Sequence, residues 1–276
     1  MSNKDTSDHV RLYFNKIWSE FIRYCPDALA INQLFRSLNN RVINDHIALR
    51  TFNHSAITID RIMQPFMSLG YQACGEYRFE ERKLYARHYE HTDPLLPKIF
   101  ISELESEKLS DKAQDIIHSL TSQIDPQTVS NPCFCYSGSP WKIHSGDYKQ
   151  LLRESDYAAW VSAIGFIPNH FTVAVNHLIS HSTLTAVNQL LLKKSFSLND
   201  NGGLIKGTPE VRLEQSSTIA KPVIASFMDK KQEVPGCFYE FARRYPLPDG
   251  KLYQGFITAS ANSIFSSTDA THKYDN

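Results

Sequence analysis

The chain has 276 residues, 42% of them hydrophobic and 12% aromatic, so it can bury roughly 70–75% of the surface that its unfolded form exposes, in one large domain or two packed halves. Basic and acidic side chains both number 29, and the resulting zero net charge favours neither nucleic acid nor a membrane as a partner. No apolar run reaches the ~20 residues of a membrane span, Met1 to His9 lacks a signal-peptide core, and the five cysteines contain no C-x-x-C pair, which indicates a protein of the reducing cytoplasm.

The first 104 residues are predicted to form two helices followed by a β-α-β-β-β pattern. In the N-terminal part, residues 1–40, apolar residues recur at helical spacing over 8–25, and Pro26 suits the first position of a second helix. A first module over 41–104 contains the strand 44–52, the helix 58–69 and the strands 71–79, 83–90 and 97–104. Pro65 lies inside that helix and argues against it.

The second half of the chain repeats this pattern after a mostly helical insertion over 105–165, which a loop interrupts at 131–147. A second module over 166–250 contains the strand 169–175, the helix 183–194 and strand-like runs at 202–207, 209–216, 221–229 and 236–244. We therefore expect one α+β domain over 1–276, in which two pseudo-symmetric βαβββ modules form a curved mixed sheet with peripheral helices. Residues 251–276 form a C-terminal tail, and its polar part, 260–276, is expected to fray.

His46 is the first candidate metal ligand. Side chains alternate along a strand, so His46 shares a face with Arg50, while Ile47, Leu49 and Thr51 lie on the other face and suit a core. A polar pair on the inner face of a sheet indicates a lined cavity, and a solvent-exposed face is an equal alternative.

His170 occupies the same place in the second module that His46 occupies in the first. His177 falls on the opposite face of the strand, so the two cannot reach one metal from it. His177 and His181 form an H-x-x-x-H pair, but the segment NHLISH lacks the glutamate of a zinc-protease motif, and a polar cap near a helix start is favoured.

Glu240 lies in the middle of an aromatic strand, CFYEFARR, where an unpaired carboxylate is costly to bury. A metal ligand and a salt bridge to Arg243 or Arg244 are equal alternatives on this pattern alone. If the two modules pair about a pseudo-twofold axis, His46 and His170 converge and the last strand adds Glu240. Two histidines and one carboxylate are typical of non-haem Fe(II) enzymes that use O₂. The equivalent strand of the first module offers only Glu103, and we assign no role to that position.

These residues lie in sequence blocks that resemble the DUF1338 family, whose characterised members are 2-oxoadipate dioxygenase/decarboxylases with a fold similar to the vicinal-oxygen-chelate superfamily. The resemblance covers roughly residues 40–245, with the blocks NDHIALRTF, NHFTV, QSST and PGCFYEFARR. It implies an Fe(II) cofactor held by His46, His170 and Glu240 in a metal cavity, with Arg50 as the substrate-binding and catalytic arginine. The chain is expected to be a short form that lacks the C-terminal segments of long bacterial members.

The resemblance also implies the chemistry. A 2-oxo acid chelates Fe(II) through its 1-carboxylate and 2-oxo oxygen, with His46 and His170 among the substrate-binding residues. O₂ takes the remaining open position, CO₂ is lost, and the same molecule is hydroxylated. With 2-oxoadipate the product is 2-hydroxyglutarate. Arg50 would hold the distal carboxylate with two hydrogen bonds. Gln215, Ser216 and Ser217 line the same cavity or belong to an ordinary strand edge, and the second alternative is slightly favoured.

Other classes of protein stay open. A glyoxalase-like isomerase or lyase would use Zn or Ni without O₂ and a fourth protein ligand. A non-catalytic small-molecule binding protein could use the same scaffold. A hydrolase is disfavoured, because the sequence contains no G-x-S-x-G and no convincing Cys/His pair.

Overall fold

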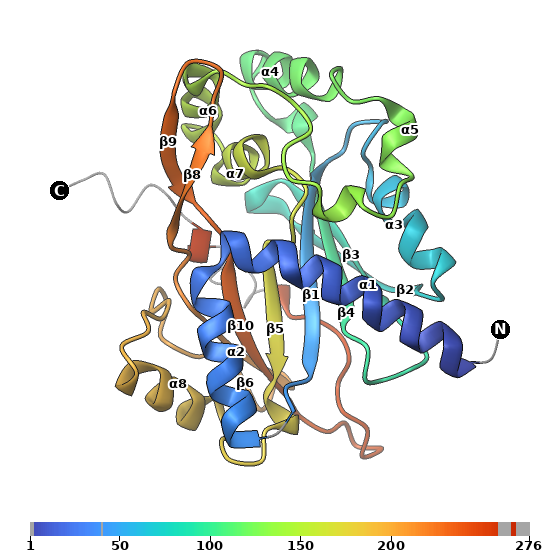
Figure 1. Cartoon of the computed structure of the whole chain (residues 1–276), viewed down its shortest axis with the longest axis vertical. Helices are drawn as coiled ribbons and strands as arrows, with labels where there is room; N and C mark the ends of the chain where they lie inside the picture. Colours follow the sequence, from blue (N-terminus) through green and yellow to red (C-terminus); the bar gives the residue numbers. More distant parts are fainter. Residues whose placement is uncertain (1–2, 40, 259–265, 269–276) are drawn as a thin grey trace.

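An eight-stranded mixed sheet organises the protein, which is described here by a computed structural model of residues 3–39, 41–258 and 266–268 (Figure 1). The strands follow the order β2-β3-β4-β1-β5-β10-β7-β6. Their bounds are β1 Asn44–Phe52, β2 Gln72–Phe79, β3 Leu84–Glu90, β4 Lys98–Leu104, β5 His170–Ala174, β6 Lys206–Thr208, β7 Leu213–Ser217 and β10 Phe238–Arg244.

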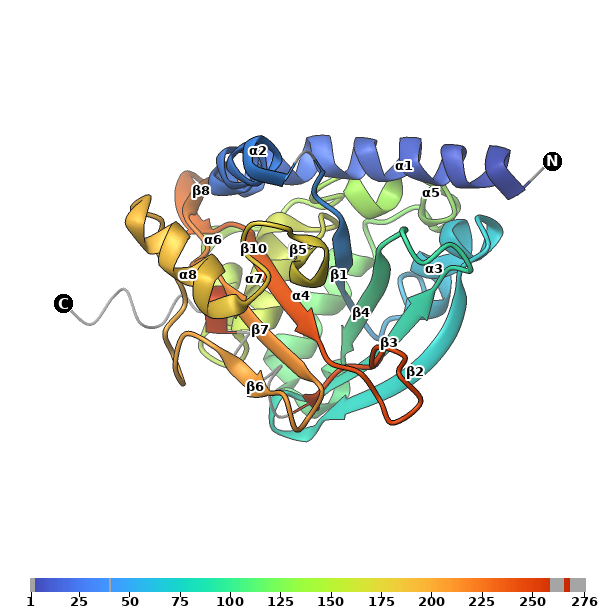
Figure 2. The same cartoon turned by 90° about the horizontal axis from the view of Figure 1, so that it is seen from below.

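The two halves of the sheet repeat one strand order and one set of pairing directions. In the first half β1 pairs with β4 in parallel, and β3 and β2 follow antiparallel. In the second half β5 pairs with β10 in parallel, and β7 and β6 follow antiparallel. An antiparallel pair, β1 with β5, joins the halves. The sheet curls into a half-barrel, so the predicted α+β fold with a curved mixed sheet is confirmed (Figure 2).

The helices cover the outer face of the curl and its ends. Helices α1 (Asn3–Tyr24) and α2 (Pro26–Asn39) lie across the central strands (Figure 2), and α3 (Ile59–Ser68) and α8 (Leu184–Lys193) are the helices of the two β-α-β-β-β patterns. Helix α3 continues through Pro65. The insertion contains α4 (Asp111–Thr121), α5 (Pro126–Val129), α6 (Ser145–Leu152) and α7 (Asp156–Ile164). None of the described helices is both long and apolar enough to span a membrane.

One predicted strand lies outside the main sheet. The run at 221–229 forms β8 (Pro222–Ser226), which pairs with β9 (Lys231–Pro235) in a separate two-stranded sheet. Pro222 and Pro235 face each other at one end of this hairpin. Proline donates no backbone hydrogen bond, so neither residue can extend a ladder there. The run at 202–207 contributes its end alone, in the short strand β6. Most of the tail expected to fray lies outside the described residues, which include Ser266–Thr268 as a 3-10 turn, η5.

The central strands are buried on both faces, and the two faces differ in chemistry. On the outer face, Phe171 packs against Trp18 and Phe21 of α1, with ring centroids 5.1 and 4.8 Å apart. Because side chains alternate along a strand, the neighbouring residues face the inside of the curl. His46, His170 and Glu240 lie on that inner face, where all three are buried. The aromatic outer face anchors the strands that carry the polar inner face.

Candidate metal centre

Three neighbouring strands bring together the three side chains that the sequence predicted to converge. His170 on β5 is opposite Phe238 of β10, and Glu240 and His46 are both opposite Thr172. The potential ligand atoms of His46, His170 and Glu240 lie within 4.8 Å of one another. The carboxylate is 3.4 Å from Nε2 of His46 and 3.5 Å from Nε2 of His170. The structure therefore shows a His-His-Glu group, and its role as a ligand set stays a prediction.

Burial dominates the electrostatics of this group. Glu240 is fully buried, and burial raises the pKa of its carboxyl above the ordinary 4.5, with the nearby His46 acting in the opposite direction. Burial also holds the pKa of His170 well below 6.5, and the charges of His46 and Arg50 add to this effect. His170 is therefore neutral at pH 7, so its contact with Glu240 is not an ion pair. Neutral imidazole is the form that binds a metal ion.

The group has the features of a site built for a cation. Oε2 of Glu240 is buried and accepts no hydrogen bond from the described residues. Leaving a buried acceptor without a donor costs about 1–3 kcal/mol, and more when it is charged. Gln215 donates to the other oxygen, Oε1, at 2.8 Å and fixes the carboxylate. A divalent cation on Oε2 would satisfy this atom, so the residues present fit a metal ion.

Hydrogen bonds behind the imidazoles set their orientation. Nδ1 of His46 lies 2.8 Å from Asp45 Oδ1, and Nδ1 of His170 lies 3.2 Å from Asn169 Oδ1. Because these oxygens accept, each Nδ1 is a donor and each Nε2 faces Glu240; Nε2 of His46 also lies 3.1 Å from the Thr172 hydroxyl. Such outer partners fix the tautomer and ring orientation of metal-binding histidines. Sequence periodicity missed both Asp45 and Asn169, although each directly precedes a candidate ligand.

Arg50 lines the same cavity as the three candidate ligands. Its guanidinium lies 5.0 Å from the ring centroids of both Tyr157 and Trp160 of α7, and Nη1 and Nη2 donate to the Thr268 hydroxyl at 3.2 and 3.3 Å. Burial lowers the pKa of Arg50 to about 10, so the side chain remains charged at pH 7. The face shared by His46 and Arg50 is thus the wall of a cavity, and the solvent-exposed alternative is wrong.

The cavity is closed on one side by the segment that follows β10. Phe256 and Ile257 of that segment complete a lining formed by His46, Ala48, Leu49, Arg50, Phe100, Ser102, Asn169, His170, Gln215 and Glu240. The ring of Phe256 meets the His46 ring edge-on, with centroids 4.8 Å apart. The cavity's mixture of apolar walls and a few polar groups is typical of a small-molecule site.

The strand β7 supplies one lining residue of the three considered. Gln215 lines the cavity and contacts Glu240. Ser217 lies on the same face and contacts the Ser267 hydroxyl at 2.9 Å. Ser216 points to the opposite face, where its hydroxyl donates to Asn188 of α8, so its proposed place in the cavity is wrong. The alternation of side chains along the strand explains the difference.

Several alternatives from the sequence are excluded by position. Arg244 forms its ion pair with Asp45 rather than Glu240, so the salt bridge that the sequence left open as an alternative for Glu240 is wrong. His177 is exposed in the turn after β5. Glu103 accepts a hydrogen bond from the Ile59 amide at the start of α3, on the face away from the cavity. Within residues 3–39, 41–258 and 266–268, the group around Glu240 contains no fourth potential ligand.

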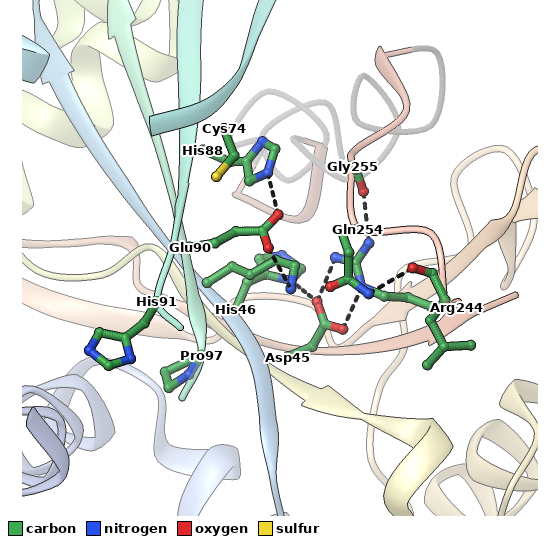
Figure 3. A network of polar contacts seen from close by, with 12 residues as sticks. Asp45, His46, Cys74, His88, Glu90, His91, Pro97, Arg244, Gln254 and Gly255 are labelled. Atoms are coloured by element: carbon green, nitrogen blue, oxygen red, sulfur yellow. Dashed lines mark hydrogen bonds and ion pairs between the residues drawn. The ribbon is translucent and has the colours of Figure 1, made fainter. Parts of the chain in front are cut away.

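A second group of metal-binding residue types lies on β2 and β3, formed by Cys74, His88 and Glu90. Both ring nitrogens of His88 are already engaged, Nδ1 with the Tyr77 hydroxyl at 2.8 Å and Nε2 with Glu90 at 2.9 Å. Figure 3 shows Glu90 turned toward His88. The hydrogen bond from His88 lowers the pKa of Glu90. This group is a hydrogen-bonded network, and it lacks the unpartnered carboxylate oxygen that distinguishes Glu240.

Solved structures of other proteins are similar to this one. A glyoxalase superfamily protein from Ralstonia eutropha shares the fold, with a TM-score of 0.69 and 22% identity over 90% of this chain and 85% of that one. A Shewanella frigidimarina protein described as a hydrolase has a TM-score of 0.86 and 46% identity over 91% of this chain and 98% of its own. Hydroxyglutarate synthase from Oryza sativa, in complex with 2-oxoadipate, has a TM-score of 0.92 and 30% identity over 98% and 95% of the two chains.

The curled sheet with its buried His-His-Glu group defines a protein of the glyoxalase-like fold class with a candidate metal site inside the curl. In sequence, residues 22–132 and 136–263 match the family model HGLS, 2-oxoadipate dioxygenase/decarboxylase. The chloroplastic enzyme of that name from Arabidopsis thaliana is 31% identical over 270 residues, which cover 88% of this chain and 73% of the plant protein. The chain belongs to the 2-oxoadipate dioxygenase/decarboxylase family, as its sequence blocks predicted.

Proposed function

We propose that this protein is an Fe(II)-dependent dioxygenase that converts 2-oxoadipate and O₂ into 2-hydroxyglutarate and CO₂. The observation that carries the proposal is a buried His-His-Glu group, His46, His170 and Glu240, in one cavity with a buried arginine, Arg50. Membership of the 2-oxoadipate dioxygenase/decarboxylase family supports the reaction, and the rice relative that binds 2-oxoadipate supports the substrate.

The metal would be held by Nε2 of His46, Nε2 of His170 and a carboxylate oxygen of Glu240. Three protein ligands leave room for a chelating substrate and O₂, and a bound Fe(II) would supply the activation of O₂ toward the 2-oxo acid. The same three-ligand donor set also binds catalytic zinc in other proteins, so the choice of iron rests on the O₂ chemistry of the dioxygenase family. A glyoxalase-like isomerase would use a fourth protein ligand, and Glu103 faces away from the cavity.

Arg50 would bind the distal carboxylate of the substrate. Its charge is buried between two aromatic rings, which hold the guanidinium in one orientation. Two of its nitrogen atoms donate to the Thr268 hydroxyl, and a carboxylate at that place would accept the same pair of donors with much stronger, charge-assisted hydrogen bonds. The distance between the metal group and Arg50 would then select a dicarboxylic 2-oxo acid over a monocarboxylic one.

The rest of the cavity would keep water from the reacting atoms. Phe100 and Phe256 pack against each other at a tilt with centroids 5.0 Å apart, and Phe256 also covers the His46 ring. An apolar cover prevents hydrolysis and side reactions of oxidising intermediates and strengthens the interactions of the charged groups beneath it. Gln215 holds Glu240 in place through Oε1 while Oε2 stays available.

Oxygen consumption by the Fe(II)-loaded protein tests the proposal across a panel of 2-oxo acids that differ in chain length and in the distal carboxylate. We expect uptake with 2-oxoadipate, with one CO₂ released and one 2-hydroxyglutarate formed per O₂. Protein loaded with Zn(II) serves as the control and should consume none. If no dicarboxylic 2-oxo acid supports oxygen uptake, the proposal is wrong.

A further inference from the structure

Arg244, at the end of β10, connects two parts of the site that are far apart in the sequence. It is buried with 4% of its surface exposed. On one side Nε and Nη2 donate to the two carboxylate oxygens of Asp45 at 2.7 and 2.8 Å. On the other side Nη1 donates to the carbonyl oxygens of Tyr253 and Gly255 at 3.1 and 2.8 Å. Figure 3 shows Arg244 between Asp45 and Gly255.

The Asp45 side of this arrangement reaches a candidate metal ligand. Oδ1 of Asp45 accepts from both Arg244 and Nδ1 of His46. The carboxylate therefore holds the proton of His46 on Nδ1 and points Nε2 toward Glu240, and Arg244 holds the carboxylate with a two-pronged ion pair. Movement of Arg244 would release Asp45 and with it the orientation of the His46 ring.

On its other side Arg244 contacts the segment 253–256, which we call the strap. Arg244 binds two strap carbonyls, its guanidinium lies 5.2 Å from the Phe256 ring centroid, and that ring covers His46. The Phe256 amide donates to the Tyr77 hydroxyl at 3.2 Å. The Tyr253 ring lies against Gly255: a Cβ added there would be 2.4 Å from the Tyr253 hydroxyl, so the ring, which donates to the Phe256 carbonyl at 3.3 Å, would have to move. The strap is thus held on both sides where it closes the cavity.

We propose that Arg244 is a positioning residue that couples closure of the strap to the orientation of His46 for metal binding. All four of its hydrogen bonds form only when Asp45 and the strap are both in place. A lysine at this position would keep the charge but could not span both partners with a planar fork. Energetic coupling between two sites is reciprocal, so a metal ion on His46 must stabilise the closed strap to the same extent that the closed strap favours the metal ion. The proposal rests on the ligand role of His46 proposed above.

Hydrogen–deuterium exchange of the peptide 252–258, measured with and without Co(II) as a stand-in for Fe(II), tests the coupling together with Co(II) affinity. In the wild-type protein we expect Co(II) to slow exchange in this peptide. Arg244→Lys should abolish that protection and weaken Co(II) binding about 10- to 100-fold, the usual effect of losing an outer partner of a metal ligand. Arg243→Lys is the matched control, because Arg243 lies over the Tyr245 ring away from the cavity, and it should behave as wild type.

A second variant perturbs the strap without replacing Arg244, because Gly255→Ala keeps the backbone carbonyl that Arg244 binds and adds only a methyl group. Gly255→Ala places a methyl group against Tyr253 and should raise exchange in the strap and weaken Co(II) binding, even if Arg244→Lys does not fold. Wild-type protein in which Co(II) leaves exchange of 252–258 unchanged would overturn the coupling, and so would an Arg244→Lys or Gly255→Ala variant that keeps full Co(II) affinity. Neither readout needs O₂ or a 2-oxo acid. Co(II)-dependent protection in a protein that oxidises no 2-oxo acid would therefore defeat the proposed function and leave this inference standing.

Discussion

Arg50→Lys tests the role of the buried arginine, because lysine keeps the positive charge but presents a single nitrogen. Arg50 directs Nη1 and Nη2 at the same point, 3.2 and 3.3 Å from the Thr268 hydroxyl, and lies between two rings at 5.0 Å. The substitution removes one of two charge-assisted hydrogen bonds to a distal carboxylate, worth about 1.5–3 kcal/mol. The dissociation constant of 2-oxoadipate should therefore rise about 10- to 150-fold.

The assay is anaerobic titration of the Co(II)-loaded protein with 2-oxoadipate and with 2-oxohexanoate, which lacks the distal carboxylate. Arg50→Lys should weaken 2-oxoadipate binding by the factor above and change 2-oxohexanoate binding by less than about threefold, because that compound offers Arg50 no anion. Co(II) affinity should not change, since lysine keeps the positive charge that acts on His170 and none of the three candidate ligands is altered. Equal losses for both compounds, or a parallel loss of Co(II), would refute the assignment of Arg50 to the distal carboxylate.

Three further substitutions separate the roles of the acidic residues. Glu240→Gln should reduce Co(II) affinity by more than about 100-fold, which exceeds the effect of losing an outer partner of a ligand. It should also raise the thermal midpoint of the metal-free protein, because a buried carboxylate is removed. Unchanged Co(II) affinity would contradict the ligand role of Glu240. Glu103→Gln should lower the free energy of unfolding by about 0.3–1 kcal/mol through its contact with the Ile59 amide and leave Co(II) affinity unchanged, whereas a loss of affinity would identify a fourth ligand. Asp45→Asn breaks a buried ion pair and should cost about 3–5 kcal/mol of unfolding free energy in urea at pH 7. Burial alone would raise the pKa of Asp45, but the charge of Arg244 and the hydrogen bonds from Arg244 and His46 outweigh burial and hold this pKa below the ordinary 3.8. The stability that the ionised carboxylate contributes is therefore complete above pH 3.8 and is lost progressively as the pH falls from 3.8 toward the lower folded pKa. A stability difference between the wild-type and Asp45→Asn proteins that stays constant down to about pH 3 would contradict this.

The sequence predicted the elements of the site, because strand and helix periodicity are local properties. Alternation along 44–52 placed His46 and Arg50 on one face, and the repeated pattern put His170 in the equivalent position of the second half. The blocks around these residues and Glu240 also indicated the family that the comparisons show. Local pattern failed where strands choose partners: the run at 221–229 joins a separate hairpin, which no periodicity of that run distinguishes from a place in the main sheet.

Only the tertiary structure decided what the polar groups do. On sequence alone Glu240 had a salt bridge to Arg243 or Arg244 as an equal alternative, and the fold resolves it because Arg244 reaches Asp45, 199 positions away in the chain. Burial depends on how the strands curl and on what covers them, so the neutral state of His170 and the unpartnered Oε2 of Glu240 have no signature in sequence spacing. The cover over His46 comes from Phe256, a residue in a segment predicted to be tail, because contacts between distant segments follow from packing and not from local pattern. The sequence determined which residues share a face of each strand, and the fold determined which face lies inside the curl and which of its residues meet.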